Sequence, residues 1–516
     1  MHWADVIAAD LVTRSNNHVI ATGITPSGHI HVGNMREILT GDTIYKALKY
    51  KDSGIEAKLI YIGDTIDPLR KVYPFLDESY SQYIGMSLYE IPCPCSEHNN
   101  YAEHFLLPFF DALKMLNVEY EPKYTHEMYK SGEYSECIHT LIEHKQEVKE
   151  ILEHISGRQL PDDWYPYNPK CGACKKITTT TVTGFEKPYV LYKCKCGYEG
   201  KADINTDDGK LPWRLDWPAR WQFLGVSCEP YGKDHATAGG SYDTGKRIIE
   251  EIFSGKAPYS VIYEWIQLKG KGAMASSTGV VVTAVEMLEI TPPEVLRFLM
   301  VRHNPNKHID FDPGLGILTL VDELDRYERI NYDIEEGDDP EDQKRTYDLS
   351  QVTTPPPEFP KQIPYRHLVN LVQIDDNWDA ILERLKRTEH FEDLTDFETA
   401  KLEQRLNCVR NWLKSFAPEN VKFRVQSDLP DITLSEDQKA FIEKLCAKFQ
   451  DDPWESDVLH NTIYSVSADL NIKPRKGFEA IYNTLLGKPQ GPRLGYFLSS
   501  LDKEFVLKRF SEIIKK

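Results

Sequence analysis

The chain lacks the long apolar runs that membrane-spanning helices require. None of its 516 residues lie in a stretch of about 18 consecutive apolar residues, so we expect no transmembrane helix. The opening stretch, 1-MHWADVIAADLVTR-14, contains Asp5 and Asp10 and has no basic segment before an apolar core. These features exclude a secretory signal peptide and predict a cytoplasmic protein with no membrane partner.

Positive charge is also in short supply. Lysine and arginine total 61 against 80 aspartates and glutamates, which gives a net charge of −19. An acidic protein repels duplex phosphates on average, so non-specific binding of nucleic acid is disfavoured, although a local basic surface remains compatible with this charge. The content of 41% hydrophobic and 27% charged residues is that of a globular protein. The length exceeds one hydrophobic core and predicts about three or four domains.

Cysteines of a cytoplasmic chain are kept reduced, so we expect no disulfides among the ten cysteines. Six of the ten fall into two groups. The pair 171-CGAC-174 and the pair 194-CKC-196 can converge on one tetrahedral zinc ion. The stretch 93-CPCSEHNNYAEHF-105 offers a second set of sulfur and nitrogen ligands. Neither group has a glutamate base beside an open position, so both sites would be structural; unligated thiols are the alternative. The predicted zinc ligands are Cys171, Cys174, Cys194, Cys196, Cys93, Cys95, His98 and His104.

The first 64 residues have the pattern of a βαβ unit. Residues 17–25 and 56–64 are strand candidates, and residues 34–51 carry apolar side chains at helical spacing. This order is typical of the start of a nucleotide-binding α/β domain with a parallel sheet. Residues 90–210 are rich in cysteine and threonine and indicate an insertion, after which the α/β pattern resumes at 258-PYSVIYEWIQL-268.

After Pro292 the pattern is mainly helical. Apolar residues recur at helical spacing through most of the remaining chain, which predicts a helical bundle. The acidic, proline-punctuated run over residues 335–360 predicts an exposed linker between the α/β half and this bundle. No repeat of about 20–50 residues is evident.

The stretch 22-TGITPSGHIHVGNMREI-38 places small residues and two histidines where the first strand passes into a helix. Backbone amides at a helix N-terminus attract anions, and Gly28 and Gly33 allow a ligand to approach the backbone closely. His31 is suited to donate to phosphate oxygens. The stretch matches neither the GxxxxGK nor the GxGxxG pattern, and taken alone it is also compatible with an ordinary turn. A second loop, 269-KGKGAMASSTG-279, has lysines and hydroxyls that suit the same triphosphate.

These two stretches are similar to known signatures. PSGHIHVGN resembles the HIGH motif and MASSTG resembles the KMSKS loop of class I aminoacyl-tRNA synthetases. Six further segments extend the resemblance over the whole chain, to the archaeal type of class I lysyl-tRNA synthetase. They are 2-HWADVIA-8, 64-DTIDPLRKV-72, 211-LPWRLDWPARW-221, 232-GKDHATAGGSYD-243, 263-YEWIQLKG-270 and 485-LLGKPQGPRLGYFL-498.

The resemblance implies a Rossmann-like α/β fold with a parallel sheet, a zinc-bearing insertion and an all-α C-terminal bundle. The implied reaction is two-step: lysine and ATP form lysyl-adenylate, and the lysyl group passes to the 3′ end of tRNA(Lys). It implies ATP, Mg²⁺ and zinc, and we expect a monomer. The implied parts are residues 1–90 and 211–290 for the catalytic domain, 91–210 for the insertion, 291–360 for a helical connector and linker, and 361–516 for anticodon binding.

Two departures from the family pattern concern the ATP site. Asn34 replaces the second histidine of HIGH, and the lysines expected in the KMSKS-like loop fall at Ala273 and Thr278. A cation facing the triphosphate stabilises the transition state, so Lys269 or Lys271 would have to substitute, or the enzyme would rely on backbone amides and hydroxyls. The implied catalytic residues are His31, Asn34, Lys269, Lys271, Ser276 and Ser277. The implied ATP-binding residues are Pro26, Ser27, Gly28, His31, Gly33, Asn34, Met274 and Ser276.

A lysine-specific pocket must hold an ammonium group on an aliphatic stem. This chemistry requires a carboxylate at one end and flat apolar walls along the stem. Asp64 and Asp67 follow the second strand, at the edge of the sheet where α/β proteins bind ligands. The implied substrate-binding residues are Gly23, Thr25, Asp64, Asp67, Trp213, Asp234, His235 and Tyr263.

Three other interpretations remain open. A class I synthetase for glutamate or cysteine is one, although an acidic 64-DTID-67 favours a cationic substrate over glutamate. A non-catalytic, synthetase-like RNA-binding or regulatory protein would account for Ala273 and Thr278. A general nucleotidyltransferase would not need the helical C-terminal half, in which 473-KPRKGFEAIY-482 offers basic and aromatic residues for the anticodon.

Overall fold

The computed structural model describes the chain apart from residues 52–53, 158, 270–271, 274–281 and 390–392. The chain divides into two compact units. Unit 1 comprises Met1–Leu288, Pro293–Phe311 and Glu336–Thr354. Unit 2 comprises Glu289–Pro292, Asp312–Glu335 and Pro355–Lys516. The predicted connector, residues 291–360, is therefore divided between the two units, and unit 2 is made of three separate segments of the chain.

Unit 1 is built on a five-stranded sheet in the order β10-β9-β1-β2-β3, in which every neighbouring pair is parallel. Its strands are β1 (Asn17–Ile24), β2 (Glu56–Gly63), β3 (Glu121–Tyr124), β9 (Cys228–Gly232) and β10 (Tyr259–Tyr263). The apolar runs of β1 and β2 are buried because helices cover the sheet. The order reverses between β1 and β9, and the carboxyl ends of strands at such a switch point form the usual ligand crevice of an open α/β sheet.

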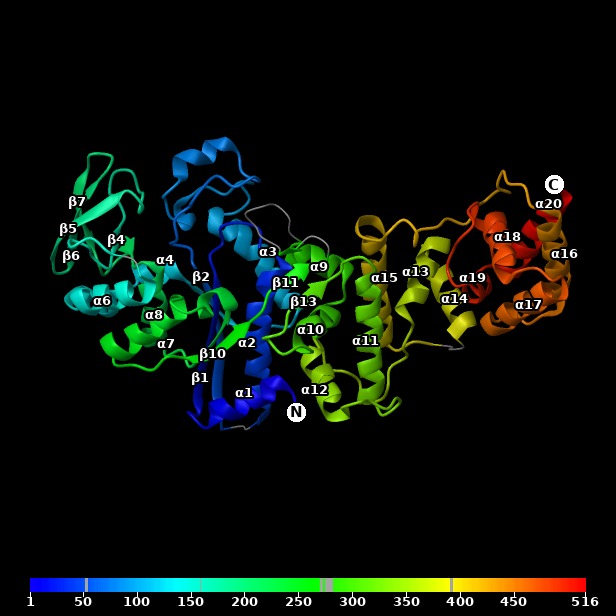
Figure 1. Cartoon of the computed structure of the whole chain (residues 1–516), viewed down its shortest axis with the longest axis horizontal. Helices are drawn as coiled ribbons and strands as arrows, with labels where there is room; N and C mark the ends of the chain where they lie inside the picture. Colours follow the sequence, from blue (N-terminus) through cyan, green and yellow to red (C-terminus); the bar gives the residue numbers. More distant parts are fainter. Residues whose placement is uncertain (52–53, 158, 270–271, 274–281, 390–392) are drawn as a thin grey trace. The chain divides into compact units, whose positions relative to one another are not determined.

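Helix α2 (Val32–Lys51) starts directly at this crevice and packs along β1, β2 and β9. Figure 1 shows it beside β1 and β2, with α1 near its far end. Helices α1 and α10 pack on its other sides, which explains why α2 is buried over most of its surface. The remaining helices of this unit are α1 (Trp3–Val12), α3 (Tyr101–Met115), α4 (Thr125–Lys130), α5 (Ser135–Glu143), α6 (Lys145–Ser156), α7 (Trp213–Leu224), α8 (Ser241–Arg247), α9 (Ala284–Ile290), α10 (Pro293–Val301) and α12 (Pro340–Ser350).

The insertion between β3 and β9 carries two small antiparallel sheets. One pairs β4 (Asn168–Pro169) with β8 (Gly209–Lys210), and the other joins β5 (Thr180–Glu186), β6 (Tyr189–Cys194) and β7 (Glu199–Asp203). A further sheet, β12-β11-β13, joins β11 (Ile266–Leu268) to β12 (Gly272–Ala273) and β13 (Ile309–Phe311). Short helical turns are η1 (Glu78–Tyr83), η2 (Leu88–Glu90), η3 (Lys233–Ala236) and η4 (Ile248–Ile252).

The predicted exposed linker over residues 335–360 is wrong in its first half, where residues 340–350 form α12. Asp339 caps this helix by accepting from the Asp342 amide, and Pro340 occupies the first turn, where its missing N–H costs nothing. Tyr347 and Leu349 are buried, so two apolar residues within an acidic run are enough to dock the helix on unit 1.

Unit 2 is all α-helical in the part that the structure describes. Thr395 and Ser435 each form a capping box that starts a long helix, which fixes where α15 and α16 begin. The helices of this unit are α11 (Leu315–Asn331), α13 (Tyr365–Ile374), α14 (Trp378–Glu389), α15 (Asp396–Ser415), α16 (Glu436–Asp451), α17 (Ser456–Asp469), α18 (Pro474–Leu486), α19 (Leu494–Ser500) and α20 (Lys503–Lys515). Helices α16 to α20 share one apolar core.

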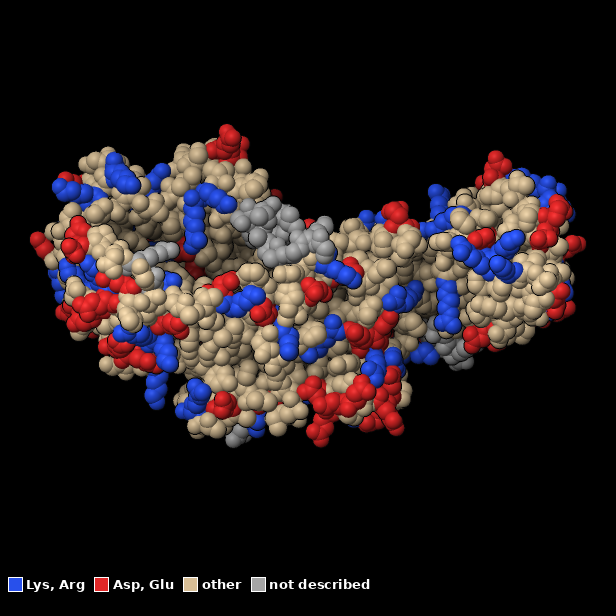
Figure 2. Space-filling view, viewed as in Figure 1, with Lys and Arg blue, Asp and Glu red and all other residues tan. Residues whose placement is uncertain are grey.

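Surface charge is mixed. Figure 2 shows basic and acidic side chains interspersed over the visible face, without a single region of one sign. Among the described helices, none is both long enough and apolar enough to cross a membrane.

Candidate active site

The signature segment, residues 25–34, connects β1 to α2. The Asn34 side chain accepts the His31 amide at 3.2 Å and so closes the first turn of α2. The Val32 amide donates to the Val282 carbonyl at 3.0 Å, and the Ala284 amide donates to Ile30 at 3.2 Å. Residues 282–284 directly follow the glycine–lysine loop, so the structure joins the end of that loop to the signature segment. Residues 30–32 and residues 282–284 are therefore neighbours in the structure although they are far apart in the sequence.

His31 is only 9% exposed, and burial lowers its pKa to about 4. The imidazole is therefore neutral at physiological pH and acts as a single N–H donor. Its Nδ1 has no hydrogen-bond partner among the described residues. A buried ring nitrogen without a partner at the start of a helix is suited to meet an oxygen of an anionic ligand.

A cavity of about 70 Å³, called the amino-acid cavity after the substrate expected above, opens at the carboxyl ends of β1, β2 and β9. Its lining residues are Thr22, Gly23, Glu37, Ile62, Asp64, Trp213, Trp217, Arg220, Glu229, Pro230, Tyr231 and His235. Gly23 is required by close packing, because a Cβ atom there would lie 2.5 Å from the Ile62 carbonyl oxygen.

Glu37 reaches the amino-acid cavity from the second turn of α2. Its Oε1 accepts the Gly23 amide at 2.8 Å, and its Oε2 accepts the Tyr263 hydroxyl at 2.7 Å. Burial raises the pKa of Glu37 to about 7, although both hydrogen bonds act in the opposite direction. No lysine or arginine in the described part of the chain forms an ion pair with this carboxylate.

Glu229 reaches the same cavity from β9. Its two oxygens accept the indole N–H groups of Trp217 at 2.8 Å and Trp221 at 2.5 Å. Burial raises the pKa of Glu229 to about 8, and the indole hydrogen bonds lower it in part. Within the described residues this carboxylate also lacks a basic ion-pair partner.

Asp64 and Asp67 are placed differently from these glutamates, because each is already paired with a buried cation. Asp64 forms an ion pair with Arg220, and Asp67 forms one with Lys210. The Thr25 hydroxyl donates to Asp67 at 2.8 Å. Burial raises the pKa of Asp67, but the Lys210 ammonium and the hydrogen bonds outweigh burial and hold it below its usual range. The two aspartates therefore give the site its shape and each already has a cation partner, although burial still raises the pKa of Asp64 to about 6.

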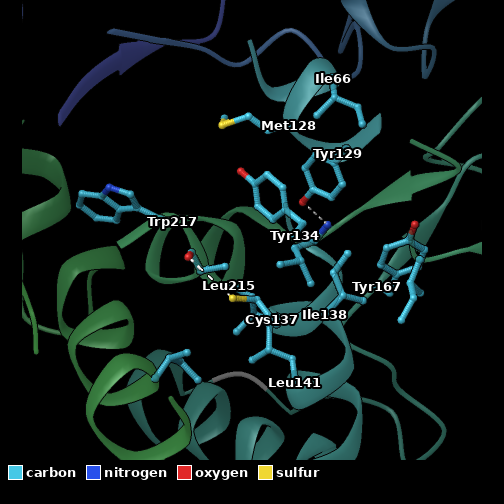
Figure 3. Close-up of a cluster of buried hydrophobic side chains, with 14 of the residues drawn as sticks. Ile66, Met128, Tyr129, Tyr134, Cys137, Ile138, Leu141, Tyr167, Leu215 and Trp217 are labelled. Carbon is cyan, nitrogen blue, oxygen red and sulfur yellow. Dashed lines mark hydrogen bonds between the residues drawn. The ribbon is translucent and has the colours of Figure 1, made fainter. Parts of the chain in front are cut away.

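Arg220 is held by a polar network inside an apolar core. Asp216 accepts from Arg220 at 2.6 Å and from the hydroxyls of Tyr129 at 2.7 Å and Tyr134 at 3.1 Å. The two tyrosine rings stack with centroids 3.8 Å apart. Figure 3 shows both rings between the insertion helices and α7, which carries Trp217. The insertion therefore fixes the cation that neutralises Asp64.

Aromatic rings form one side of the amino-acid cavity. The His235 ring lies 6.0 Å from Trp213 and 5.4 Å from Trp217, measured between centroids. Tyr231 meets Trp217 edge to face at 5.5 Å. The predicted residues Trp213 and His235 thus line the cavity, whereas Asp234 is exposed on η3 and does not line it. The stretch around Trp213, which shows no core periodicity in sequence, is helix α7, with Trp217 and Trp221 buried.

The remaining predicted ATP-site residues divide into described and undescribed positions. Pro26, Ser27, Gly28 and Gly33 lie in the signature segment, and the Ser27 carbonyl accepts the Tyr101 hydroxyl at 2.8 Å. Lys269 is exposed at the end of β11. Ala273 lies in β12, where it pairs with Gln267. The positions outside the described residues are Lys271, Met274, Ser276, Ser277 and Thr278.

Arg36, next to Glu37 on α2, is almost fully buried and donates only to backbone carbonyls. Its guanidinium reaches Glu264 at 2.5 Å and Lys307 at 2.5 Å. Further contacts go to Pro305 at 3.0 Å, and to Trp265 and Asn304 at 3.4 and 3.5 Å. Burial lowers the pKa of Arg36 to about 10, so it remains charged. It ties the segments before β11 and before β13 to the helix that carries the signature.

Two clusters in unit 1 have the geometry of metal sites. In the four-cysteine cluster the Sγ atoms of Cys171 and Cys196 lie 3.7 Å apart, as do those of Cys174 and Cys194. Four sulfurs at about 2.3 Å from one tetrahedral zinc ion would be separated by about 3.8 Å. The structure thus brings together all four predicted ligands of this cluster.

The second cluster is a cysteine–histidine set. The Sγ atom of Cys93 lies 3.5 Å from the Nδ1 atoms of both His98 and His104, and Cys95 lies 3.4 and 3.1 Å from them. These separations also suit a tetrahedral ion. Both clusters could bind zinc, and all eight predicted ligands belong to them.

Sequence reasoning missed eight of the twelve residues that line the amino-acid cavity, among them Glu37, Trp217, Arg220 and Glu229. Glu37 could have been found, because it lies one helical turn beyond Asn34 and so faces back to the end of β1. Glu229 sits in a short apolar strand, where an unpaired acid is itself a signal of function. Nothing in the sequence places Arg220 beside Asp64, because that contact spans the whole insertion.

The fold, a parallel sheet whose first strand and helix flank the signature segment, is that of a class I aminoacyl-tRNA synthetase. The family described as class I tRNA synthetases (K) matches residues 1–353, and an anticodon-binding domain family matches residues 414–514. The chain belongs to the class I tRNA synthetase (K) family.

Curated relatives agree with this membership over the full length. A lysine--tRNA ligase of Picrophilus torridus is 45% identical over 515 residues, which cover 100% of this chain and 99% of the relative. One of Methanosarcina barkeri is 46% identical and covers 99% and 97% of the two chains. One of Archaeoglobus fulgidus is 45% identical and covers 99% of each.

Proposed function

We propose that this protein is a lysine–tRNA ligase that joins L-lysine to tRNA(Lys) at the cost of ATP. One observation carries the choice of lysine: the amino-acid cavity holds Glu37 and Glu229, two carboxylates without basic partners among the described residues, between aromatic walls. A cationic side chain on an apolar stem fits these features. A glutamate substrate would place a third anion there, and a cysteine side chain would leave the carboxylates unpaired.

Glu37 is the proposed acceptor for the lysine side-chain ammonium. Tyr263 fixes one of its oxygens and the Gly23 amide fixes the other, so the carboxylate is aimed into the cavity before substrate arrives. Trp213 and His235 pack along the aliphatic stem. Gly23 and Thr25, at the end of β1, contact the α-amino end, where Asp67 orients the Thr25 hydroxyl. This assignment moves the ammonium from Asp64 and Asp67 to Glu37.

The signature segment is the proposed ATP site. Gly28, Gly33 and the amides that begin α2 admit the nucleotide, and His31 donates from its neutral ring to an oxygen of the reacting phosphate. A lysine carboxylate oxygen attacks the α-phosphorus, pyrophosphate leaves, and lysyl-adenylate forms. Mg²⁺ would be held mainly by the phosphates. Lys269 and the loop residues Lys271, Ser276 and Ser277 supply the charge or hydrogen bonds that a KMSKS lysine would supply.

In the second step a hydroxyl of the tRNA terminal ribose attacks the lysyl carbonyl. AMP leaves, and the hydroxyl proton is lost as the ester forms. No protein nucleophile is needed, since positioning and charge stabilisation supply most of the rate. Unit 2 is the proposed reader of the anticodon loop, and residues 473–482 on and before α18 offer it basic and aromatic side chains. We infer that the enzyme acts as a monomer in the cytoplasm.

The two clusters are the proposed structural zinc sites. Four thiolates in one and two thiolates with two imidazoles in the other complete a tetrahedron and leave no position for a substrate. The four-cysteine cluster would fold the insertion, whose helices position Arg220 through Tyr129 and Tyr134, and the cysteine–histidine cluster would hold the segment between β2 and β3.

Exchange of pyrophosphate into ATP, measured with each of the twenty amino acids and with and without tRNA, tests the proposed function. Exchange with lysine alone supports it. No exchange with any amino acid, together with retained binding of tRNA, would instead support the non-catalytic alternative that Ala273 and Thr278 suggest. Exchange with a different amino acid would show a different synthetase.

A further inference from the structure

The assignment of the lysine ammonium to Glu37 leaves a second carboxylate of the same cavity without a role. Glu229 lines the cavity from β9 and is 9% exposed. Both of its oxygens are held by indole N–H groups, so the carboxylate has a fixed orientation. An acid fixed in this way within an apolar core is costly unless a cation approaches it.

The charged groups around Glu229 come from four other elements. Glu37 of α2 and Asp64 after β2 are acidic, Arg220 of α7 is basic, and His235 of η3 is a histidine whose pKa burial lowers. Arg220 is already shared between Asp64 and Asp216. Among the described residues the cavity therefore contains two carboxyl groups without an ion-pair partner, for a substrate whose side chain carries one positive charge.

We propose that Glu229 is a specificity-determining residue of the lysine site that gives up a proton to solvent when lysine binds, so that both glutamates face the bound ammonium as anions. This inference rests on the proposed function, since it presumes that the cavity binds lysine. The reaction is balanced: the neutral carboxyl and the lysine cation become a carboxylate, a bound cation and one released proton.

The protonation of Glu229 depends on the charges that surround it in this small cavity. Burial and the nearby Glu37 keep a proton on Glu229 near neutral pH, against the two indole donors and Arg220. A cation within about 4–6 Å lowers the pKa of a carboxyl by about 1–3 units. Proton loss therefore accompanies lysine binding, and lysine affinity falls by up to about tenfold for each pH unit below the free-state pKa of Glu229.

Proton release can be counted by lysine-binding calorimetry in two buffers of different ionisation enthalpy, between pH 6.5 and 8.5. We expect the wild-type protein to release about one proton per lysine at pH 7.5, and Glu229→Gln to release clearly less than half of that. Glu250→Gln, an exposed substitution in the same unit, serves as the matched control and releases the wild-type number. An unchanged proton count in Glu229→Gln would overturn the proposal.

Discrimination between substrates separates this role from a purely structural one. We expect Glu229→Gln to lower kcat/KM for lysine in pyrophosphate exchange at least about tenfold, while KM for ATP stays within about twofold. Norleucine, which has the same stem without the ammonium, should lose nothing. Equal losses for lysine and norleucine would show a structural role and overturn the proposal.

Trp221→Phe provides a second route if Glu229→Gln does not fold. Trp221 donates to Glu229 without lining the cavity. Removing its N–H destabilises the carboxylate form, so the midpoint of proton release should move to higher pH and lysine binding at pH 7 should weaken several-fold and recover near pH 8.5. An unshifted midpoint would contradict the proposal. Wild-type protein that binds no lysine at any pH would overturn the proposed function itself.

Discussion

At the scale of single residues, the start of α2 carries the proposed contacts to both ATP and lysine. His31 lies directly before α2 and is kept neutral by burial, whereas Glu37 lies six positions later and burial raises its pKa. Tyr263 and the Gly23 amide each donate to one oxygen of the Glu37 carboxylate. The proposed lysine-binding and ATP-binding residues are therefore linked through the start of α2.

Glu37→Gln should weaken lysine recognition selectively. The amide keeps the size of the side chain but removes its charge, and a charged hydrogen bond contributes about 1.5–3 kcal/mol. We expect KM for lysine to rise about 10- to 150-fold in pyrophosphate exchange, with KM for ATP within about twofold. Tyr263→Phe, which removes only one donor to Glu37, should have a smaller effect in the same direction. Equal changes in both KM values would contradict this role.

The buried glutamates also predict an unusual dependence of stability on pH. The folded-state pKa values of Glu37 and Glu229, about 7 and about 8, lie above the ordinary value of 4.5, so the folded protein binds protons that the unfolded chain has released. Their stabilising contribution is present at low pH and is lost as pH rises through these values. Between pH 6.5 and 8.5, the contribution of Glu229 to the free energy of unfolding in urea should fall by about 2 kcal/mol, measured as the difference in pH slope between the wild-type protein and Glu229→Gln. Saturating lysine should remove this difference.

At the scale of secondary-structure elements, α2 organises unit 1 by its contacts on three sides. It covers β1, β2 and β9, begins with the signature segment, and uses Arg36 to hold the carbonyls before β11 and β13. The strand that leads into the glycine–lysine loop is therefore fixed to the same helix as the ATP signature. The insertion adds a second anchor through α7 and Arg220.

Arg36→Lys tests the guanidinium contacts. A lysine ammonium has three donors and no planar fork, so it cannot satisfy five carbonyls on two segments. Each buried carbonyl left without a partner costs about 1–3 kcal/mol, and we expect a total loss of about 3 kcal/mol in the free energy of unfolding. Arg247→Lys, at a partly exposed arginine on α8, should cost less than about 0.5 kcal/mol. Similar values for the two variants would refute the role assigned to Arg36.

The two proposed zinc clusters act at the same scale, and the four-cysteine cluster brings Cys171 and Cys174 to Cys194 and Cys196 beside the short strands of the insertion. Cys174→Ser should remove one of about two zinc ions per chain, measured by metal analysis, and should lower the melting temperature more than it lowers kcat. Cys446→Ser, on α16 and outside both clusters, should keep both ions. A zinc content unchanged by Cys174→Ser would show that the cysteine cluster binds no metal.

At the scale of the whole molecule, the two units are interleaved in sequence. Helix α11 precedes α12 in the chain but belongs to unit 2, where Asp325 and Glu328 form buried ion pairs with Arg405 and Lys401 of α15. A chain cut after residue 354 would therefore leave α11 without its partners. The two compact units therefore cannot be divided by a single cut in the chain.

Asp325→Asn should separate the activity that depends on unit 2 from the activity that depends on unit 1. It leaves Arg405 buried without its counter-charge, which costs about 3–5 kcal/mol within unit 2. We expect aminoacylation of tRNA to fall at elevated temperature well before lysine-dependent pyrophosphate exchange, which needs only unit 1. Parallel loss of both activities would contradict this independence. Asp322→Asn, at a half-exposed position on α11, is the matched control.

The sequence was sufficient for the parts of this structure that local patterns determine. The βαβ start, the signature segment and both cysteine clusters follow from spacing within short stretches, and the resemblance to a family placed Trp213 and His235 near the substrate. The ion pairs of Asp64 and Asp67 could not be predicted, because Arg220 and Lys210 approach across the insertion. Helix α12 was missed because only Tyr347 and Leu349 interrupt its polar pattern.

The paired glutamates of the amino-acid cavity also determine which mistakes the enzyme is prone to make. A cavity that selects by charge disfavours an uncharged amino acid of the same length, because its side chain cannot supply the cation with which the two buried glutamates would pair. It has far less power against ornithine, which keeps the cation and lacks one methylene, a difference of only about 1–3 kcal/mol. Translation errors arising at this enzyme should therefore replace lysine by other cationic amino acids and leave apolar substitutions rare.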